Sequence, residues 1–529
     1  MDGLAIGPRL CLRGTVTGAP STPDLPMVVE LERLNLPFSV LLWRAARGAA
    51  LVAVASFLTA CSLTGQDGAG EVLKPSDNPV TFESSARDER MRKLAESQHP
   101  RILETYGGEY SDPRLERMVA RVVGRLIAAT QDPAQSYKIT ILDSPSVNAF
   151  ALPGGYLYVT RGLLALANDS AELAAVLSHE MAHVTANHGI QRRQAEQEAG
   201  IAEKVAQDVL AGDPNARAAV IRGKLRLAEF SRNQELEADA ISIKQIGEAG
   251  FDPFAAARFL RSMSAYSQFR SVSGADDPSL DFLASHPSSQ RRIDLALRHA
   301  RTFGPPGSGV TDREAYLDGI DGIIYGDTPD EGYVRGRDFL HPGLGIRFSV
   351  PAGFVLDNSA TAVTAAGPGD VAVRFDGVAV DRSTGPEAYI ASGWVSGLDE
   401  TSIRSARIGG FQGATARAAA DGWQFDIAVV RAGPQIFRIL TAAPASSNAL
   451  APTASFVRDS FATMTQAERQ SLKPLRIRVV SVSAGQSLAT LASRMTGTDR
   501  KLDLFRLLNA MGPGSTVSAG DRVKIVTDQ

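Results

Sequence analysis

The spacing of apolar residues changes its period several times along the chain, and each change predicts a different kind of element. Two segments, 91–107 and 114–130, carry apolar residues at helical spacing and predict two helices. The next segment, 137–144, alternates apolar and polar residues and predicts a strand. Residues 149–167 predict a hairpin that turns at 153–155, where a proline precedes two glycines. This part of the chain is therefore expected to place a small sheet among helices.

The segment 168–189 predicts a helix with one apolar side. That side consists of Leu173, Val176, Leu177 and Val184. Asp169 followed by Glu172 has the spacing of a capping box at the beginning of the helix. Gly189 is placed to end it, because glycine readily adopts the left-handed conformation of a helix C-terminus.

Polar and charged residues are frequent in the following segment, 190–228, and the sequence Gly-Asp-Pro-Asn at 212–215 interrupts it. We expect two solvated helices here, and the alternative is a lid over a cleft. A further helix is predicted at 231–250, ending at Gly250. Asp252, which precedes a proline, is expected to begin the next one.

The last third of the chain changes to short alternating runs separated by turn residues. A connector at 306–335 contains a short helical stretch. Residues 336–468 then predict a β-rich α+β domain that ends in a helix near 457–467. This domain contains no cluster of His, Cys or acidic residues, so a structural or partner-docking role is expected. Residues 472–529 predict the order strand, helix, helix, strand.

Composition and charge exclude several classes of protein. The chain has 529 residues, of which 44% are hydrophobic and 21% charged, and this suits a globular protein of several domains. A net charge of -3 argues against nucleic acid as a partner. Only two cysteines are present, Cys11 and Cys61, and both precede the expected folded part. A disulfide framework and a cysteine metal site are therefore excluded.

The beginning of the chain is expected to target the protein to a membrane. Arg44 and Arg47 precede a short apolar run at 48–60, which has the length of a signal-peptide core rather than of a membrane span. The sequence at 58–61 resembles the lipobox of bacterial lipoproteins, which implies a lipid on Cys61. The alternatives are an uncleaved signal anchor or a buried cysteine. Because residues 1–40 are long and acidic for a leader, translation is expected to start further along, near Met27.

The sequence His-Glu-Met-Ala-His at 179–183 carries the clearest chemistry of the chain. Residues four apart project from one face of a helix, so His179 and His183 can hold a single metal ion. Glu180 lies beside the first histidine, within reach of a water molecule at that metal. The alternative is a chance match or two core histidines, but buried histidines without partners are costly. The motif therefore indicates a zinc peptidase.

Catalytic zinc usually has three protein ligands, so one more ligand is needed. The metzincin pattern is excluded, because it requires glycine and histidine where this chain has Ala186 and Gly189. A carboxylate from the helix at 231–250 remains, and Glu235, Glu237 and Asp239 are candidates. Glu235 and Asp239 share one helical face and Glu237 points nearly opposite. One of the pair can bind the metal while the other braces a histidine.

Three motifs, at 179–183, 231–239 and 148–155, together resemble the HtpX and BepA group of zinc peptidases, metallopeptidase family 48. The resemblance covers about residues 85–305. It implies that Glu235 is the third zinc ligand, with one Zn²⁺ per chain, and that Asp239 acts from the second layer. It also implies that the strand with the double glycine lines the substrate cleft. The residues of that strand are Asn148, Phe150, Gly154 and Gly155.

Three further residues, His286, His188 and Arg232, are considered for roles at the site. A histidine in a similar His-Pro context can reach the zinc in the BepA-like members, which would make His286 a gate over the water position. The alternative for His286 is an ordinary surface loop. His188 is expected to lie on a different face of the motif helix and to be structural. Arg232 and His286 are candidates for stabilising the oxyanion.

The resemblance implies a zinc endopeptidase in which Glu180 is the general base. Long membrane-spanning helices of the HtpX type are absent from the sequence, which places the chain with the soluble periplasmic branch. Its substrates would be unfolded or misassembled envelope proteins. One alternative is a non-catalytic chaperone or assembly factor with a gated zinc site. Another is an adaptor tethered to the cell wall.

Residues 472–529 resemble a LysM module. The segment 484–492 stands at the turn and first helix of that module, and 507–511 with 519–526 matches its close. Gln486 and Ser487 replace the usual Asp-Thr pair, which weakens the expectation of glycan binding. Contact with peptidoglycan through this module is therefore a hypothesis separate from the fold.

The expected fold class is a multidomain α+β protein. It comprises a mainly helical zinc peptidase domain of the gluzincin type with a small edge sheet, a β-rich α+β domain and a small βααβ domain. We expect a periplasmic protein anchored by Cys61 to the outer membrane. The expected boundaries are a leader at 1–60, a tether at 61–82, the peptidase domain at 83–305, a connector at 306–335, the β-rich domain at 336–468 and the LysM-like domain at 472–529.

Overall fold

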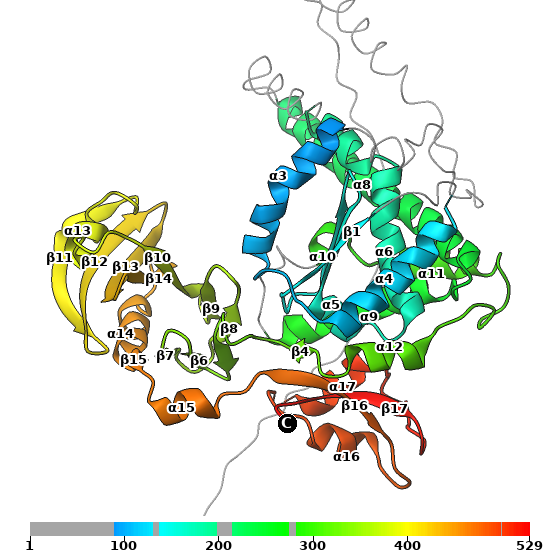
Figure 1. Cartoon of the computed structure of the whole chain (residues 1–529). Coiled ribbons are helices and arrows are strands. Elements are labelled where there is room, and N and C mark those ends of the chain that lie inside the picture. Colours follow the sequence, from blue (N-terminus) through cyan, green and yellow to red (C-terminus); the bar gives the residue numbers. More distant parts are fainter. Residues whose placement is uncertain (1–88, 131–136, 198–213, 274–281, 499) are drawn as a thin grey trace, which may run out of the picture. The chain divides into compact units, whose positions relative to one another are not determined.

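The structure of the protein, a computed structural model, has the mixed α+β composition that the sequence predicts (Figure 1). It describes residues 89–130, 137–197, 214–273, 282–498 and 500–529. These residues all fall within one compact unit, Leu73–Gln529. The predicted leader, Cys61 and the tether lie outside the described residues. Among the described helices, none combines the length and apolar character needed to cross a bilayer.

The two predicted N-terminal helices are present as α3 (Glu89–Thr105) and α4 (Pro113–Ala128). Asp112 caps the beginning of α4, because its side chain accepts hydrogen bonds from the backbone N–H groups of Arg114 and Leu115. Pro113, the first residue of the helix, has no backbone N–H group that would need a partner. The buried side of α4 is apolar, as the helical spacing of the apolar residues in 114–130 predicts. It consists of Leu115, Met118, Val119, Val122, Val123 and Leu126.

The predicted strand and hairpin form a three-stranded sheet in the order β1-β3-β2. The strands are β1 (Lys138–Leu142), β2 (Ala149–Leu152) and β3 (Tyr156–Thr160). β1 runs parallel to β3, and β2 runs antiparallel to it. Gly154 and Gly155 form the turn with φ angles of 90° and 83°, which explains the double glycine. Thr160 then caps the short helix α5 (Arg161–Leu166).

The motif helix is α6 (Ser170–Thr185), and nearly all of its residues are buried. Asp169 caps it as predicted, because its side chain accepts from the Glu172 N–H at 2.8 Å. The reciprocal half of the capping box differs, since Glu172 accepts from the N–H of Asn168 instead. The prediction that Gly189 ends the helix is wrong. The helix ends at Thr185, and Asn187 reverses the chain with a φ of 59°.

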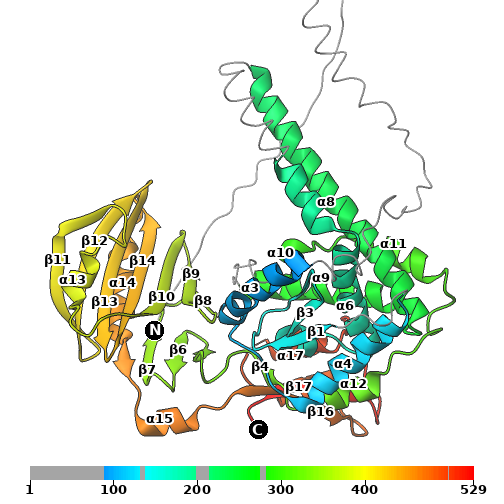
Figure 2. The same ribbon diagram turned by 45° about the horizontal axis from the view of Figure 1, so that its top comes forward.

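Two long helices follow and lie against the motif helix (Figure 2). They are α8 (Pro214–Glu248) and α9 (Ala255–Ser273). Gly250, with a φ of 76°, separates them as predicted, and the Asp252 side chain accepts from the Phe254 N–H at 3.0 Å. Residues 188–197 are helical, whereas 198–213 lie outside the described part of the chain. The peptidase region closes with α10 (Phe282–Ser285) and α11 (Gln290–Ala300), and the connector contains the expected helix, α12 (Arg313–Ile320).

The β-rich segment forms two antiparallel sheets. A seven-stranded sheet has the order β11-β12-β13-β14-β10-β9-β8, and a four-stranded sheet has the order β15-β7-β6-β5. The strands are β5 (Tyr333–Arg335), β6 (Asp338–His341), β7 (Ile346–Ser349), β8 (Val355–Asn358), β9 (Val363–Gly367), β10 (Val371–Ala379), β11 (Leu398–Ile408), β12 (Phe411–Ala420), β13 (Trp423–Ala432), β14 (Gln435–Pro444) and β15 (Ala462–Thr463).

Three helices accompany these sheets. They are α13 (Pro386–Ile390), α14 (Leu450–Ser460) and α15 (Gln466–Ser471). The helix expected near 457–467 therefore begins and ends earlier than predicted. The physical reason is that β15 follows α14 directly and pairs with β7, which takes the residues after Ser460 out of the helix.

The C-terminal segment has the predicted order of strand, helix, helix and strand. Its elements are β16 (Leu475–Ser481), α16 (Leu488–Ser493), α17 (Lys501–Leu508) and β17 (Arg522–Thr527). β16 pairs antiparallel with β17 on one side and with β4 (Ile324–Tyr325) of the connector on the other.

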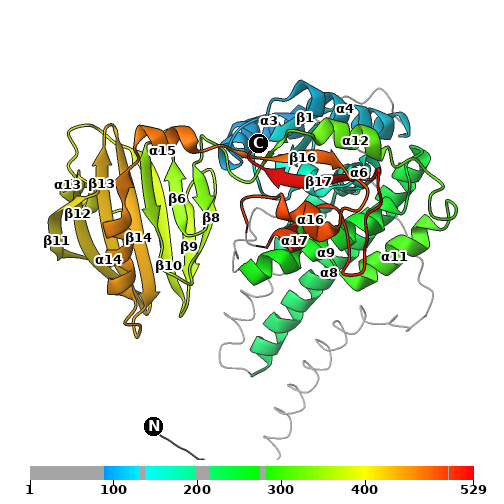
Figure 3. The same ribbon diagram turned by 90° about the horizontal axis from the view of Figure 1, so that it is seen from below.

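This C-terminal segment shares a hydrophobic core with the peptidase helices. A single cluster of buried residues contains Leu177 of α6 together with Ile477, Phe505 and Val526 of the C-terminal segment. Figure 3 shows α17 beside α9, and the Arg500 side chain donates to the Phe269 carbonyl of α9 at 2.8 Å. Residues 475–527 therefore complete the core around the motif helix.

Lys524 of β17 makes the most specific connection in this shared core. Its side chain is fully buried, and its ammonium group donates to the carbonyls of Ala165, Leu166 and Ala167 at 2.9, 3.1 and 2.8 Å. These carbonyls belong to the end of α5, which has no further helical partners for them. Lys524 thus fixes the chain just before the motif helix begins.

We expect Lys524→Met to destabilise the protein by about 2–5 kcal/mol, because the buried carbonyls of Ala165 and Ala167 lose their donor. Thermal unfolding of the purified protein, followed by circular dichroism, measures the change. Lys473→Met removes an exposed lysine at the start of the same segment and should leave the unfolding temperature unchanged. Equal stability of the two variants would contradict the role given to Lys524.

Candidate metal centre

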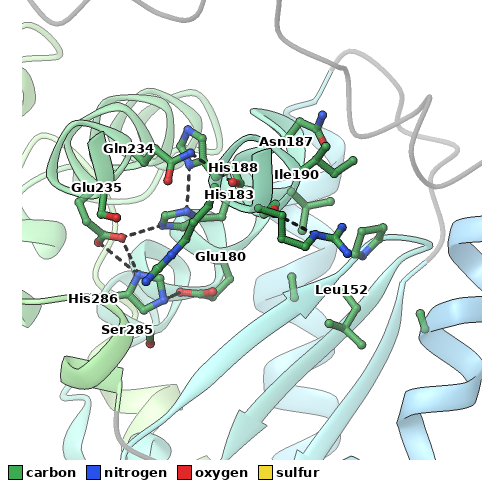
Figure 4. Close-up of a pocket in the computed structure, with 18 of the residues that line it drawn as sticks. Leu152, Glu180, His183, Asn187, His188, Ile190, Gln234, Glu235, Ser285 and His286 are labelled. Carbon is green, nitrogen blue, oxygen red and sulfur yellow. Dashed lines mark hydrogen bonds and ion pairs between the residues drawn. The ribbon is translucent and has the colours of Figure 1, made fainter. Parts of the chain in front are cut away.

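Three side chains from two helices, His179, His183 and Glu235, converge on one point. Figure 4 shows two of them, His183 and Glu235. His179 and His183 of α6 bring their Nε2 atoms to 3.0 Å from each other. The carboxylate of Glu235, from α8, places one oxygen 3.4 Å from His179 Nε2 and the other 3.4 Å from His183 Nε2. Of the three candidate acids, Glu235 is the one whose carboxylate lies beside the Nε2 atoms of His179 and His183.

The spacing of these atoms fits a zinc ion. A tetrahedral site with metal–ligand distances of about 2.0–2.2 Å separates its ligand atoms by about 3.3–3.6 Å. The separations of 3.0, 3.4 and 3.4 Å lie close to that value. Two imidazoles and one carboxylate are also the donor set of a zinc site that leaves one position for water. The side chains present therefore suit Zn²⁺.

Two polar contacts, one between side chains and one from a side chain to the backbone, fix the alignment of α6 with α8. Ser178 donates its hydroxyl to the Gln245 side-chain oxygen at 2.7 Å. Ser242 donates to the Ala175 carbonyl at 3.0 Å. All four lie on the faces that the two helices turn toward each other. Because these polar contacts are buried, they fix the register that brings Glu235 opposite the histidines.

A second layer holds His179 and Glu235 in place. Asp239 lies 3.1 Å from Nδ1 of His179, on the far side of the ring from the metal position. The guanidinium group of Arg292, from α11, donates one hydrogen bond to each oxygen of Asp239, both at 2.8 Å. Its Nη1 atom lies 2.9 Å from a carboxylate oxygen of Glu235. Such contacts fix the tautomer and the orientation of ligand side chains. Sequence reasoning missed Arg292, because it is one of two adjacent arginines in a charged segment.

His183 is braced differently, by a histidine. Nδ1 of His188 lies 2.9 Å from Nδ1 of His183, and its Nε2 lies 3.4 Å from the Glu237 carboxylate. The expectation that His188 points away from the site is wrong, because the reversal at Asn187 brings it back beside the motif. Glu237 likewise reaches the site through His188. The Asn-His-Gly sequence after the motif was the available signal, since asparagine readily adopts positive φ.

Glu180 lies in the same pocket, and one of its carboxylate oxygens accepts no hydrogen bond from the described residues. Its Oε1 is buried, has no hydrogen-bond partner, and lies 3.6 Å from His286 Nε2. Burial raises the pKa of the Glu180 carboxyl above its ordinary value, although the charges of His286 and His179 oppose this. A carboxylate with a raised pKa is suited to take and return a proton near neutral pH.

Burial and the neighbouring charges both shift the pKa values of the side chains in this site. Burial opposes the ionisation of Glu235, but His286 and His179 outweigh it and hold its pKa well below the usual range. Burial lowers the pKa of His183 well below its ordinary value, and the neighbouring histidines add to this. Burial also acts to lower the pKa of His179, but Asp239 and Glu235 prevail and raise it to about 9. The pocket thus favours binding a cation.

His286 joins the three converging side chains. Ligand atoms of His179, His183, Glu235 and His286 all lie within 4.8 Å of one another. Nδ1 of His286 is 3.0 Å from Glu235, and its ring stacks on Phe282 at 4.5 Å. The following residue, Pro287, accepts a hydrogen bond from Arg292 at 2.9 Å. The structure therefore places the proposed gate at the metal position rather than on the surface.

A cleft of about 410 Å³ opens beside this group. Ala151, Leu152 and Pro153 of the β2 edge line it, so the strand chosen from sequence borders the cleft. None of the four residues named from sequence is among the described residues that line this cleft. Asn148 donates to the Tyr106 hydroxyl at 3.0 Å, Phe150 stacks on Tyr158, and the two glycines form the turn. Arg232 is exposed and does not belong to the described lining of the cleft.

We expect Asp239→Asn to weaken zinc binding about 10- to 100-fold, because His179 loses the carboxylate that orients it. Competition with a chromogenic chelator measures the dissociation constant. Asp294→Asn changes an exposed acid on α11 and serves as the control. Unchanged zinc affinity in Asp239→Asn would contradict the role of the second layer.

Two histidines from one helix, a carboxylate from another and a glutamate beside them form an arrangement that is typical of metallopeptidase sites. Residues 112–300 match the model of Peptidase family M48. This match agrees with the family resemblance that the sequence motifs indicated.

Known proteins resemble part of the chain. The mitochondrial metalloendopeptidase OMA1 of Schizosaccharomyces pombe is 30% identical over 206 residues, which are 38% of this chain and 58% of that protein. The putative beta-barrel assembly-enhancing protease of Vibrio cholerae is 29% identical over 204 residues, 37% of this chain and 41% of that protein. The beta-barrel assembly-enhancing protease of Escherichia coli K12 is 26% identical over 204 residues, with the same shares. This chain thus spans between 41% and 58% of these relatives.

Proposed function

We propose that the protein is a zinc-dependent endopeptidase in which His179, His183 and Glu235 hold the metal. The observation that carries this proposal is the convergence of these three side chains around one point, with the uncommitted carboxylate of Glu180 in the same pocket. A purely structural zinc site would have no use for Glu180.

When bound, zinc supplies a Lewis acid that polarises the peptide carbonyl and makes water acidic enough to react at neutral pH. Glu180 takes the proton of the attacking water and passes it to the nitrogen of the leaving amine. Asp239 and the His188–Glu237 pair hold the two histidines in the tautomers that leave their Nε2 atoms free for the metal. Burial excludes bulk water from this proton transfer.

A second candidate function follows from the position of His286. Because its ring lies among the metal-binding atoms, it can fill the place that water needs, and the protein would then act as an assembly factor with a closed site. Zinc-loaded wild type and His286→Ala, tested on unfolded casein, distinguish the two functions. We expect His286→Ala to be at least as active as the wild type. Inactivity of both, with full zinc occupancy, would favour the assembly factor.

The proposed substrates are unfolded or misassembled proteins of a bacterial envelope. The names of the Vibrio cholerae and Escherichia coli relatives, assembly-enhancing proteases, support this assignment. The proposal includes periplasmic location and a lipid on Cys61, and mass spectrometry of the membrane-extracted protein tests the lipid. A LysM-like function of residues 472–529 is also part of the proposal. Sedimentation with purified cell-wall sacculi tests contact with peptidoglycan and the cell-wall adaptor alternative.

A further inference from the structure

The two ends of the cleft beside the metal centre differ in chemistry. Gln234 and Ser285 lie toward one end, and Leu152 and Ile190 lie on the opposite side of His183 (Figure 4). Leu94, Val184 and Ser231 line the same cleft. His183 lies between these two groups of residues, and Asn187 lies beside Ile190 (Figure 4).

The apolar end is assembled from three separate elements. Leu94 comes from α3, Leu152 from the edge strand β2, and Ile190 from the helical segment 188–197. Leu94 is 47% exposed, although its helix packs on the β2–β3 turn through Arg92 at Gly154. A single exposed leucine is common on protein surfaces. Three apolar side chains that line one cleft next to a reactive centre are characteristic of a ligand pocket.

The edge strand offers a way to place a peptide across this pocket. β2 pairs with β3 on one side, and no strand of the described residues pairs with its other side. An extended peptide can add to such an edge through backbone hydrogen bonds, with its alternate side chains entering pockets. We expect the substrate residue that pairs with the edge beside Leu152 to direct its side chain toward Leu152 and Ile190. A peptide bond next to that substrate residue would then lie near Glu180.

We propose that Leu94, Leu152 and Ile190 form a side-chain subsite that selects a bulky apolar residue, such as Leu, Ile, Met or Phe, close to the scissile bond. The proposal rests on the endopeptidase function and names its substrate class. That class is extended segments that carry exposed apolar side chains. Folded proteins bury most such side chains, so the subsite would direct cleavage to unfolded chains.

Two arginines at the same end offer a competing selection, for an acidic residue. Arg192 and Arg193 both line the cleft. However, Arg192 already pairs with Glu196 at 3.1 Å, and Arg193 donates to the Gly189 carbonyl at 3.3 Å. Their charges are therefore engaged on their own helix, which favours the apolar assignment.

Binding to the full-length Glu180→Gln protein tests the subsite without cleavage. The probes are fluorescent decapeptides of Ser, Thr and Gln that carry one Leu, placed in turn at each position, and the matched peptide with Ser. Fluorescence anisotropy should show binding at least about 10-fold tighter for one Leu position than for the Ser peptide. Adding Leu94→Gln or Ile190→Gln should remove that difference. Leu344→Gln, which changes a 41% exposed leucine of the β-rich domain, should keep it.

Cleavage of a proteome-derived peptide library by the wild type, analysed by mass spectrometry, separates the two proposals. Enrichment of Leu, Ile, Met and Phe at one position beside the cleaved bond supports the subsite. Cleavage without that enrichment, or with enrichment of acidic residues, overturns the subsite and leaves the endopeptidase standing. Leu-selective binding without any cleavage supports the subsite and overturns the hydrolytic function. Equal effects of Leu94→Gln and Leu344→Gln on binding would also overturn the subsite.

Discussion

Glu180→Gln should lower the rate of peptide hydrolysis by about 10²- to 10⁴-fold while zinc stays bound. Glutamine has nearly the same shape as glutamate but cannot take a proton from water. The fold should tolerate the change, because the Glu180 Oε1 atom has no hydrogen-bond partner to lose. Casein cleavage, together with the zinc content by mass spectrometry, measures both effects.

The control for this experiment is Glu116→Gln, an exposed glutamate on α4 far from the motif in sequence. It should retain the activity and zinc content of the wild type. Hydrolysis by Glu180→Gln at the wild-type rate would show that another group acts as the base. Loss of zinc from the variant would show instead that Glu180 takes part in metal binding.

Removing residues 472–529 should unfold the peptidase domain or destabilise it by more than about 5 kcal/mol, the lower end of the stability of a typical domain. The physical reason is that Ile477, Phe505 and Val526 belong to the same buried cluster as Leu177 of the motif helix. Their loss would expose this core to water, and the carbonyls before α6 would lose Lys524. For a domain of this size the unfolding temperature should fall by more than about 10 °C.

Circular dichroism and hydrolysis assays on the shortened protein measure this effect. A milder variant keeps the result interpretable if the shortened protein is insoluble. Arg500→Ala removes the hydrogen bond to Phe269 and the stacking of the guanidinium on its ring at 4.2 Å. A shortened protein with unchanged stability and activity would show that the C-terminal segment is an independent module.

The sequence predicted the elements around the metal because their signals are local. The two histidines and Glu180 lie on one helix, and their spacing alone indicates the metal. The strands of the β-rich segment followed from alternating apolar residues. Glu235 could be chosen from its helix only together with the family resemblance, because three acids on that helix were candidates.

The second layer could not be predicted, because it depends on contacts between distant segments. Arg292 reaches Asp239 across 53 residues of sequence, and no local pattern distinguishes it from Arg291. The prediction for His188 was wrong because it assumed a helix that continues past Asn187, whereas α6 ends at Thr185. The shared core of the C-terminal segment was also missed, since an apolar strand does not reveal which neighbour covers it.

Anomalous X-ray scattering at the zinc absorption edge, from crystals of the zinc-loaded protein, tests the central claim most directly. We predict one peak about 2.0–2.2 Å from His179 Nε2, His183 Nε2 and an oxygen of Glu235. A peak at another place, or a zinc-loaded crystal without a peak between these three side chains, would contradict the account.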